Sequence, residues 1–358
     1  MNPNVSFTNN EIITGIRNRM KIGQNKVITD SDEHVNNNYV NKINSPHQNS
    51  NLKGKDFQYL IDSKEPDISN DNQNQNASNL NNNNQNNNSL THFNKEEYKK
   101  EIEKVFEFSP NLKIELINSV SLEKGLIIKI NPFGMVNSIR KENDGFTYFG
   151  FVEPNEPNNT MDFIVKPKDD NYEARYVGKH FQIRFNPSDM KYYIQDLGCG
   201  FGTFMKLTDE IIIKDNYLIN LGNSYIVCIY GTDDLVQIDN LSSDICEKLL
   251  NVKIFSGNGN NVQSSFNPNT KSKIFIGRDP ECDIVIDDSL LSRIHCTIIY
   301  KENLGWVLRD GRYLENEAEG KPSTNGTWLY LMEETQIYDG MIFKGNQNLF
   351  SCSYSEIK

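Results

Sequence analysis

The stretch Ile274–Trp328 carries the most informative pattern of this chain. It begins IFIGRDPECDIVIDDSLLSRIHCTIIYKENLGWVLRD, continues through a polar loop and ends PSTNGTW. Short runs rich in β-branched and aromatic residues alternate with turn residues, which is typical of strands joined by loops. Arginine, hydroxyl and asparagine side chains fall in the loops, where they can donate hydrogen bonds to anions and to peptide backbone. The pattern therefore predicts a binding surface for an anion and a peptide backbone rather than a site of proton transfer.

Four signals recur in a fixed order: Gly277-Arg278, Ser292-Arg293, His295 and Asn325-Gly326-Thr327. Their order and spacing resemble the forkhead-associated (FHA) domain, a β-sandwich that binds phosphothreonine peptides. The resemblance implies a phosphopeptide site made of Arg278, Ser292, Arg293, Thr324 and Asn325. Within this set it gives Asn325 the contact to the ligand main chain, and the others contacts to the phosphate or the adjacent backbone. It gives supporting, structural roles to Gly277, His295, Gly326 and Thr327.

The loop between Asp310 and Pro322 is longer than the resemblance leads us to expect, and it holds Glu315, Glu317 and Glu319. One interpretation is a solvated insertion. The other is that these carboxylates lie near the arginines and compete with a phosphate, which carries about −1.5 to −2 charges. Whether the acidic loop 311–320 blocks the pocket is left open by the sequence. An unchanged phosphopeptide affinity after its deletion would exclude the competition.

An earlier region of the chain, from Gly150 to Gly222, resembles a degenerate copy of this pattern, which indicates an internal repeat. LINLG at 218–222 matches MIFKG at 341–345, and the structural positions Gly150, His180 and Gly202 are kept. The positions that would bind phosphate carry instead Phe151, Val177 and Phe201. A phosphate there would leave its charge unpaired among apolar side chains, which is costly. We therefore expect the first copy to be a packing or protein-interaction module that binds no phosphate.

The fold class predicted from these patterns is mainly β, with two FHA-type sandwiches in tandem. Residues 1–92 are rich in asparagine and poor in aromatic residues, so they bury too little apolar surface to order, and we expect disorder. An amphipathic helix is expected over residues 93–110, with an apolar stripe that packs on the domain after it. The first, degenerate sandwich is then expected over residues 111–235, a short linker over 236–250 and the second sandwich over 251–358.

The tail contains a candidate ligand, Thr29, followed three residues later by Asp32. One hypothesis is that phosphorylated Thr29 binds the second sandwich, within one chain or between two chains. The other is that the acidic tail is unmodified.

Composition excludes several other classes of function. A net charge of −11 argues against nonspecific nucleic-acid binding, which needs a basic face. No leader or membrane-length apolar run is visible, so we expect no membrane contact and an intracellular protein, cytoplasmic or nuclear. The six scattered cysteines include no C-x-x-C pair, which favours buried thiols over a metal site. We expect no cofactor and no metal.

The stretch YIQDLGCGFGT, residues 193–203, offers a remote alternative. It resembles the first motif of Rossmann-type methyltransferases, in which a glycine-rich loop approaches S-adenosylmethionine and then opens a helix. No helical stripe follows here, and residues 196–204 also fit the FHA pattern without a gap.

Three functional hypotheses remain. The first is a non-enzymatic, phosphothreonine-dependent adaptor or scaffold that binds phosphothreonine-containing proteins through the second sandwich. The second is a structural component of a large assembly, for example a cytoskeletal or ciliary one, that uses FHA folds as phosphate-independent interaction blocks. The third is an enzyme, for which no nucleophile–base pair or metal cluster is apparent.

Overall fold

The structure is a computed structural model that describes residues 94–153, 157, 160–168, 172, 174–231, 248–257, 259, 261–313 and 320–355. The predicted disordered segment 1–92, Thr29 and most of the predicted linker lie outside the described residues. The described chain is mainly β, as predicted, and contains the α-helix α3 (Lys95–Val105), followed by a 3-10 turn at Phe106–Phe108. Among the described residues, no helix has the length and apolar character needed to cross a membrane.

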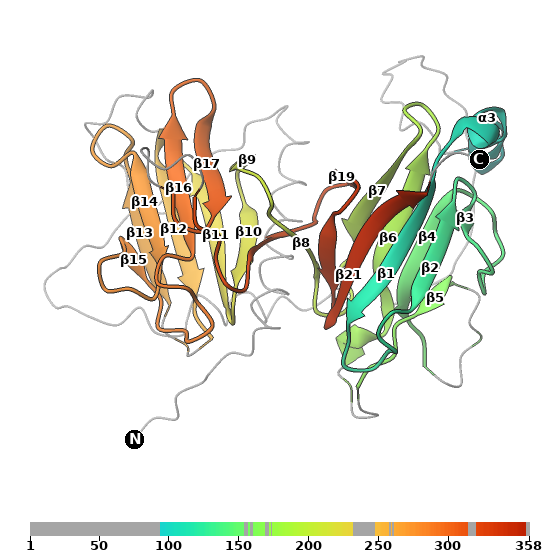
Figure 1. Cartoon of the computed structure of the whole chain (residues 1–358), viewed down its shortest axis with the longest axis horizontal. Helices are drawn as coiled ribbons and strands as arrows, with labels where there is room; N and C mark the ends of the chain where they lie inside the picture. The colour runs from blue at the N-terminus through green and yellow to red at the C-terminus, as the bar shows by residue number, and fades with distance from the viewer. Residues whose placement is uncertain are drawn as a thin grey trace, which may run out of the picture. The chain divides into compact units, whose positions relative to one another are not determined.

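The strands form three sheets (Figure 1). An eleven-stranded sheet has the order β13 (Val262–Phe266), β12 (Leu250–Phe255), β11 (Ser224–Tyr230), β10 (Tyr217–Leu221), β18 (Thr327–Tyr330), β8 (Thr203–Lys206), β20 (Ile342–Gly345), β21 (Asn348–Ser355), β1 (Asn111–Asn118), β2 (Ile127–Asn131), β3 (Gly134–Met135). One five-stranded sheet has the order β15 (Ile284–Val285), β14 (Lys273–Gly277), β16 (Cys296–Lys301), β17 (Gly305–Asp310), β9 (Ile211–Ile212). The other has the order β19 (Thr335–Gln336), β7 (Lys191–Asp196), β6 (Gly178–Asn186), β4 (Phe146–Phe151), β5 (Phe163–Ile164).

Two separate hydrophobic cores show how these strands are divided. Among the described residues, the buried side chains of one core run from Leu207 to Leu329, and the partly buried Met205 packs against them. The other uses residues from Ile102 to Ile194 together with residues from Leu331 to Cys352. We call the first unit, residues 207–330, the inner sandwich, and the second unit, residues 95–206 with 331–355, the outer sandwich. The inner sandwich is continuous in sequence and is inserted into the outer one.

This division corrects the predicted domain boundaries 111–235 and 251–358. Strand β11, from the first predicted domain, pairs with β12 of the second, from Tyr225↔Phe255 to Tyr230↔Leu250. Strand β21, at the end of the second, pairs with β1 of the first, from Asn111↔Ser355 to Asn118↔Leu349. The last strands of the two repeats, β9–β11 and β19–β21, have therefore exchanged places. The sequence could not reveal this exchange, because polar and apolar residues alternate in the same way in both copies. By this pattern alone, the last strands of each copy could complete its own sandwich or the other one.

Side-chain volume distinguishes the two exchanged hairpins. Leu221↔Ser224 closes the β10–β11 hairpin and Gly345↔Asn348 closes β20–β21. Two residues before each closing pair, Ile219 faces Ile226 in the inner sandwich and Phe343 faces Phe350 in the outer one. The two phenylalanines therefore occupy the positions that the two isoleucines occupy in the inner core. The sequence match of LINLG to MIFKG, which aligned Gly222 with Gly345, is therefore off by one residue.

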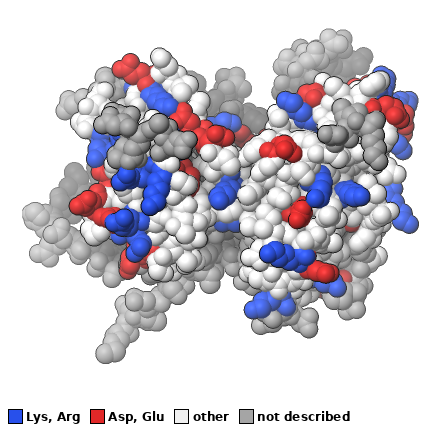
Figure 2. All heavy atoms as spheres, viewed as in Figure 1, with Lys and Arg blue, Asp and Glu red and all other residues white. Residues whose placement is uncertain are grey.

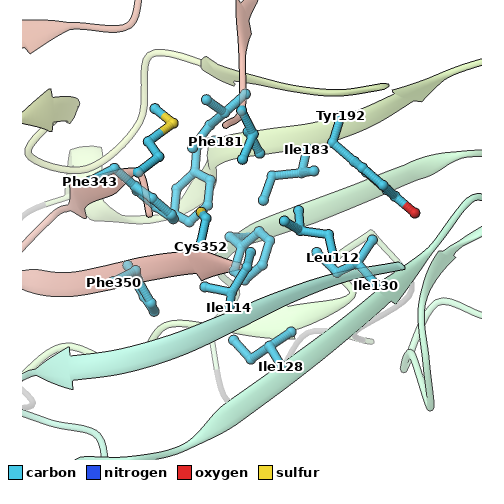
Figure 3. Close-up of a cluster of buried hydrophobic side chains, with 14 of the residues drawn as sticks. Leu112, Ile114, Ile128, Ile130, Phe181, Ile183, Tyr192, Phe343, Phe350 and Cys352 are labelled. Atoms are coloured by element: carbon cyan, nitrogen blue, oxygen red, sulfur yellow. The ribbon is translucent and has the colours of Figure 1, made fainter. Parts of the chain in front are cut away.

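The outer core is built to receive these two phenylalanines. Figure 3 shows Phe343, Phe350 and Cys352 among side chains of β1, β2 and β6. The ring of Phe343 lies 5.0 Å from that of Phe350 and 5.6 Å from that of Phe181. Aromatic pairs of this kind contribute roughly 0.5–1.5 kcal/mol beyond the burial of their area.

Helix α3 packs on the outer sandwich, as expected from its apolar stripe. Ile102 is fully buried, and Tyr98 and Val105 pack against the outer core. The Tyr98 hydroxyl donates to the carbonyl oxygen of Phe185 and accepts from a guanidinium nitrogen of Arg184 at 3.0 Å. The buried residues of the helix and these hydrogen bonds fix it against β6.

The exchange predicts which fragments fold. We expect residues 207–330 alone to unfold cooperatively and at a higher temperature than residues 251–358. The shorter-range alternative, in which residues 251–358 close on themselves, would place Phe343 and Phe350 where the inner core holds isoleucines, and such overpacking costs about 1–3 kcal/mol. Circular dichroism melts and the dispersion of amide NMR signals would measure this. Equal or greater stability of residues 251–358 would contradict the prediction.

Candidate functional site

The five predicted binding residues lie on neighbouring loops of the inner sandwich. Arg278 follows β14, Ser292 and Arg293 lie between β15 and β16, and Thr324 and Asn325 lie between β17 and β18. Both arginines, Thr324 and Asn325 are exposed, and Ser292 is half-buried. The sequence therefore identified residues that the fold brings to one end of one sandwich.

Hydrogen bonds join these loops to one another. The Arg278 N–H donates to the Ser292 carbonyl oxygen at 3.2 Å, which ties the first loop to the second. The Thr324 N–H donates to Ser292 Oγ at 2.9 Å, and Ser292 Oγ lies 3.2 Å from Thr324 Oγ1. Asn325 Nδ2 donates to the Leu290 carbonyl oxygen at 2.6 Å. A pair of hydroxyl groups thus sits between loops that carry exposed arginines.

Gly277 and His295 hold the loops from beneath. A Cβ atom at Gly277 would come within 2.0 Å of the Arg293 carbonyl oxygen, so this position excludes every other residue. His295 is completely buried, and its Nδ1 accepts from the Ser292 N–H at 3.1 Å. Its proton is therefore on Nε2, which lies 3.1 Å from the Gly326 carbonyl oxygen. One imidazole connects the serine loop to the Asn325-Gly326 turn.

Asp310 organises the same turn, and the sequence analysis missed it. Its carboxylate accepts from Ser323 N at 3.0 Å, from Ser323 Oγ at 2.7 Å and from Thr327 Oγ1 at 2.6 Å. Ser323 Oγ in turn accepts from the Gly326 N–H at 2.9 Å. The signal that could have found it is Asp196, which stands at the start of the related pattern in the outer sandwich.

The acidic loop lies largely outside the described residues, which stop at 313 and resume at 320. Its base is closed by paired backbone hydrogen bonds, Arg312 N to Lys321 O at 2.9 Å and Lys321 N to Arg312 O at 3.0 Å. Gly311 directly follows β17, and its N–H donates to the His295 carbonyl oxygen at 2.7 Å. Deletion of all of 311–320 would therefore damage the site itself. The positions of Glu315, Glu317 and Glu319 are not among the described residues, and their competition with phosphate stays a prediction.

The equivalent place in the outer sandwich is filled by aromatic rings. The Tyr176 ring lies 5.7 Å from that of Phe151 and 5.5 Å from that of Phe201, and Val177 is half-buried beside it. Burial raises the pKa of Tyr176 to about 12. Gly150 is kept for the same reason as Gly277, since a Cβ there would lie 2.2 Å from the Gly178 carbonyl oxygen.

Asn346, from the exchanged β20–β21 hairpin, braces the outer loops. Its Oδ1 accepts from Phe201 N at 2.6 Å, its backbone N–H donates to Gly202 O at 3.0 Å, and its side chain contacts His180. The inner site receives a similar contact, from Asn223 N to Asp288 Oδ2 at 2.8 Å. Each set of loops is thus supported by a hairpin that the sequence predicts for the other sandwich.

The glycine-rich stretch of the methyltransferase alternative joins two strands. Strand β7 ends at Asp196 and β8 begins at Thr203, where that enzyme fold requires a helix. Within the described residues, no group of three or more His, Cys, Asp or Glu side chains could hold a metal ion. The five described cysteines are free thiols, and burial raises the pKa of Cys228 and Cys352 to about 12.

Comparison with known proteins identifies one matching family. The FHA domain family model matches residues 274–344, a span that runs from the inner sandwich into β19 and β20 of the outer one. Similar solved structures include the Slr1951 protein from Synechocystis sp. (21% identity, 30% of this chain and 94% of that one, TM-score 0.17) and FHA-1 of Rv1747 from Mycobacterium tuberculosis (21%, 26% and 89%, 0.13). Another is a structure from work on phosphothreonine-dependent FHA domain interactions (20%, 28% and 90%, 0.13). No curated protein matches the chain.

The chain therefore contains an FHA domain, which the family model matches over residues 274–344.

His295 predicts a pH dependence of stability. Burial lowers its pKa below the usual value, more than the Gly326 carbonyl oxygen raises it. Because the unfolded chain then binds the proton more readily, the free energy of unfolding of the inner sandwich should fall as the pH drops below about 6.5. Thermal melts between pH 8 and pH 5 would show this, and His295→Gln should have a shallower pH dependence. An identical slope in the variant would contradict the assignment.

Proposed function

We propose that this protein binds phosphothreonine-containing proteins through the loops of the inner sandwich and acts as a non-enzymatic adaptor. The observation that carries the proposal is the pair of exposed arginines, Arg278 and Arg293, beside the Ser292–Thr324 hydroxyl pair. Neither arginine forms an ion pair with another described residue, although the chain has a net charge of −11. A dianionic phosphate supplies the missing partner, and charge-assisted hydrogen bonds to arginine are short and strong.

The remaining side chains suit an extended peptide. Asn325 uses its Nδ2 on Leu290, which orients the side chain and leaves Oδ1 to accept a main-chain N–H of the ligand. In the view of Figure 2, Lys and Arg side chains lie among Asp and Glu over both sandwiches. This mixture of signs on the visible face suits local binding of one phosphate better than binding of a polyanion.

The outer sandwich has a different role in this proposal. Phe151, Tyr176 and Phe201 occupy the place of the phosphate site, where a dianion would lose its hydration without gaining donors. The outer sandwich therefore acts as a packing or protein-interaction module. The same observation favours the second candidate function, a phosphate-independent component of a large assembly, because the outer sandwich keeps its fold without the residues that would bind phosphate. Self-association through phosphorylated Thr29 concerns a residue outside the described range.

Removing one arginine tests the proposal. Arg278→Ala should weaken binding of phosphothreonine peptides about tenfold or more, since hydrogen bonds to charged groups contribute roughly 1.5–3 kcal/mol. Capture from a phosphothreonine peptide library, followed by fluorescence polarisation with selected peptides, would measure this. Lys301→Ala is the matched control, because it removes one positive charge from the same sandwich at an exposed pair with Glu210. If wild type binds phosphorylated and unphosphorylated peptides equally, the result would contradict the adaptor function and favour the phosphate-independent component of a large assembly.

Neutralising the acidic loop tests the competition with phosphate. The triple variant Glu315→Gln, Glu317→Gln and Glu319→Gln leaves Gly311 and the Arg312–Lys321 backbone pairing intact. If the carboxylates approach the arginines, phosphopeptide affinity should rise severalfold at low salt and less at high salt, because salt screens exposed charges. Titration of one peptide at two ionic strengths would measure the effect. Unchanged affinity at both would identify the loop as a solvated insertion.

A further inference from the structure

An open cavity of about 240 Å³ lies directly beside the proposed peptide site. It is lined by Asn220, Gly222, Leu290, Asn325, Trp328 and Lys344. Asn325 is shared with the phosphopeptide site, and Asn220 and Gly222 come from the β10–β11 hairpin. Lys344 comes from β20, which belongs to the outer sandwich. The exchange of strands therefore brings a side chain of one sandwich to the binding loops of the other.

Lys344 is held in the cavity wall by its neighbours. Its ammonium lies 4.6 Å from the ring centre of Trp328 and 5.1 Å from that of Phe204, and it donates to Asn220 Oδ1. Asn220 cannot turn away, because its Nδ2 donates to Gly222 O at 3.2 Å and to Ser224 O at 3.1 Å. The asparagine oxygen is thereby directed at the lysine.

The cavity contains a cation with unused donors. An ammonium has three donors, and within the described part of the chain Asn220 is the one hydrogen-bond acceptor that Lys344 reaches. No described carboxylate pairs with it. Burial lowers its pKa to about 7, as expected for a lysine that lacks a counter-ion. A carboxylate that entered the cavity would supply the counter-ion and the missing acceptors.

We propose that Lys344 binds a glutamate or aspartate side chain of the phosphopeptide ligand in this cavity. The inference rests on the proposed function, because the same peptide would cross Asn325 and place its phosphate by the arginines. The site would then select phosphothreonine peptides that carry an acidic residue close to the phosphothreonine. This selectivity uses a residue of the C-terminal hairpin, which no isolated inner sandwich would contain.

The lysine gives this selectivity a pH dependence. A group with a lowered pKa near 7 is charged below that pH and neutral above it. Preference for an acidic over a neutral side chain should therefore be larger at pH 6 than at pH 8.5. The carboxylate of the peptide keeps its charge over this range, so the change reports the lysine. Phosphate itself titrates near pH 6, and both peptides of a compared pair share that effect.

The experiment uses the full-length protein and phosphothreonine peptides in which each position around the phosphothreonine is either glutamate or glutamine. At one position, wild type should bind the glutamate peptide about fivefold or more tightly at pH 6, measured by fluorescence polarisation. Lys344→Met should remove this preference, so that the glutamate and glutamine peptides bind equally. Lys253→Met, which replaces a half-buried lysine of β12 in the same sheet, should retain it.

Lys344→Arg tests the charge in a second way, should the methionine variant unfold. Arginine stays protonated at all these pH values, so a retained preference should no longer vary between pH 6 and pH 8.5. The inference is overturned if wild type shows phosphate-dependent binding but no acidic preference at any position. It is also overturned if the preference survives Lys344→Met. Loss of the difference between phosphothreonine and threonine peptides would instead overturn the proposed function, and this inference with it.

Discussion

The antiparallel pairing of β8 with β18 is the contact on which the rest of the structure depends. Three residue pairs, Trp328↔Lys206, Leu329↔Met205 and Tyr330↔Phe204, join the sheets of the two sandwiches into one. The chain leaves the outer sandwich at one end of this ladder and returns at the other. Leu207 N donates to Thr327 O at 2.9 Å and Leu331 N to Thr203 O at 2.9 Å, and these leucines are buried in different cores.

Core volume explains why each hairpin stays in its sandwich. The outer core packs Phe343 and Phe350 edge-on against Phe181, whereas the inner core has Ile219 and Ile226 at these places. Interiors are close-packed, so a phenylalanine in a space shaped for isoleucine costs stability, and the reverse leaves a cavity. The backbone pattern permits both arrangements, and side-chain shape selects one of them.

Because of the exchange, residues from both repeats and both sandwiches lie around the candidate site. The loops that carry Arg278, Ser292 and Asn325 belong to the inner sandwich, and Asn223 of the hairpin from the first repeat supports them at Asp288. Lys344 reaches the neighbouring cavity from the outer sandwich. A pocket that is local in sequence is thus completed by residues that are distant in sequence. The FHA family model matches residues 274–344, and because the hairpins are exchanged this span crosses from the inner sandwich into the outer one.

The sequence by itself determined the β class and the presence of an FHA domain, and it predicted the repeat and the loop positions of the five candidate binding residues. These follow from local alternation, turn residues and short motifs, which need no knowledge of the partner strand. Only the tertiary structure decided which hairpin completes which sandwich, and hence which groups Asp310, Asn346 and Lys344 contact. Strand pairing is long-range, and two copies with one alternation pattern are interchangeable until their side chains meet a core. The contacts of Phe343 and Phe350 with Phe181 join residues far apart in the sequence, so only the folded structure reveals them.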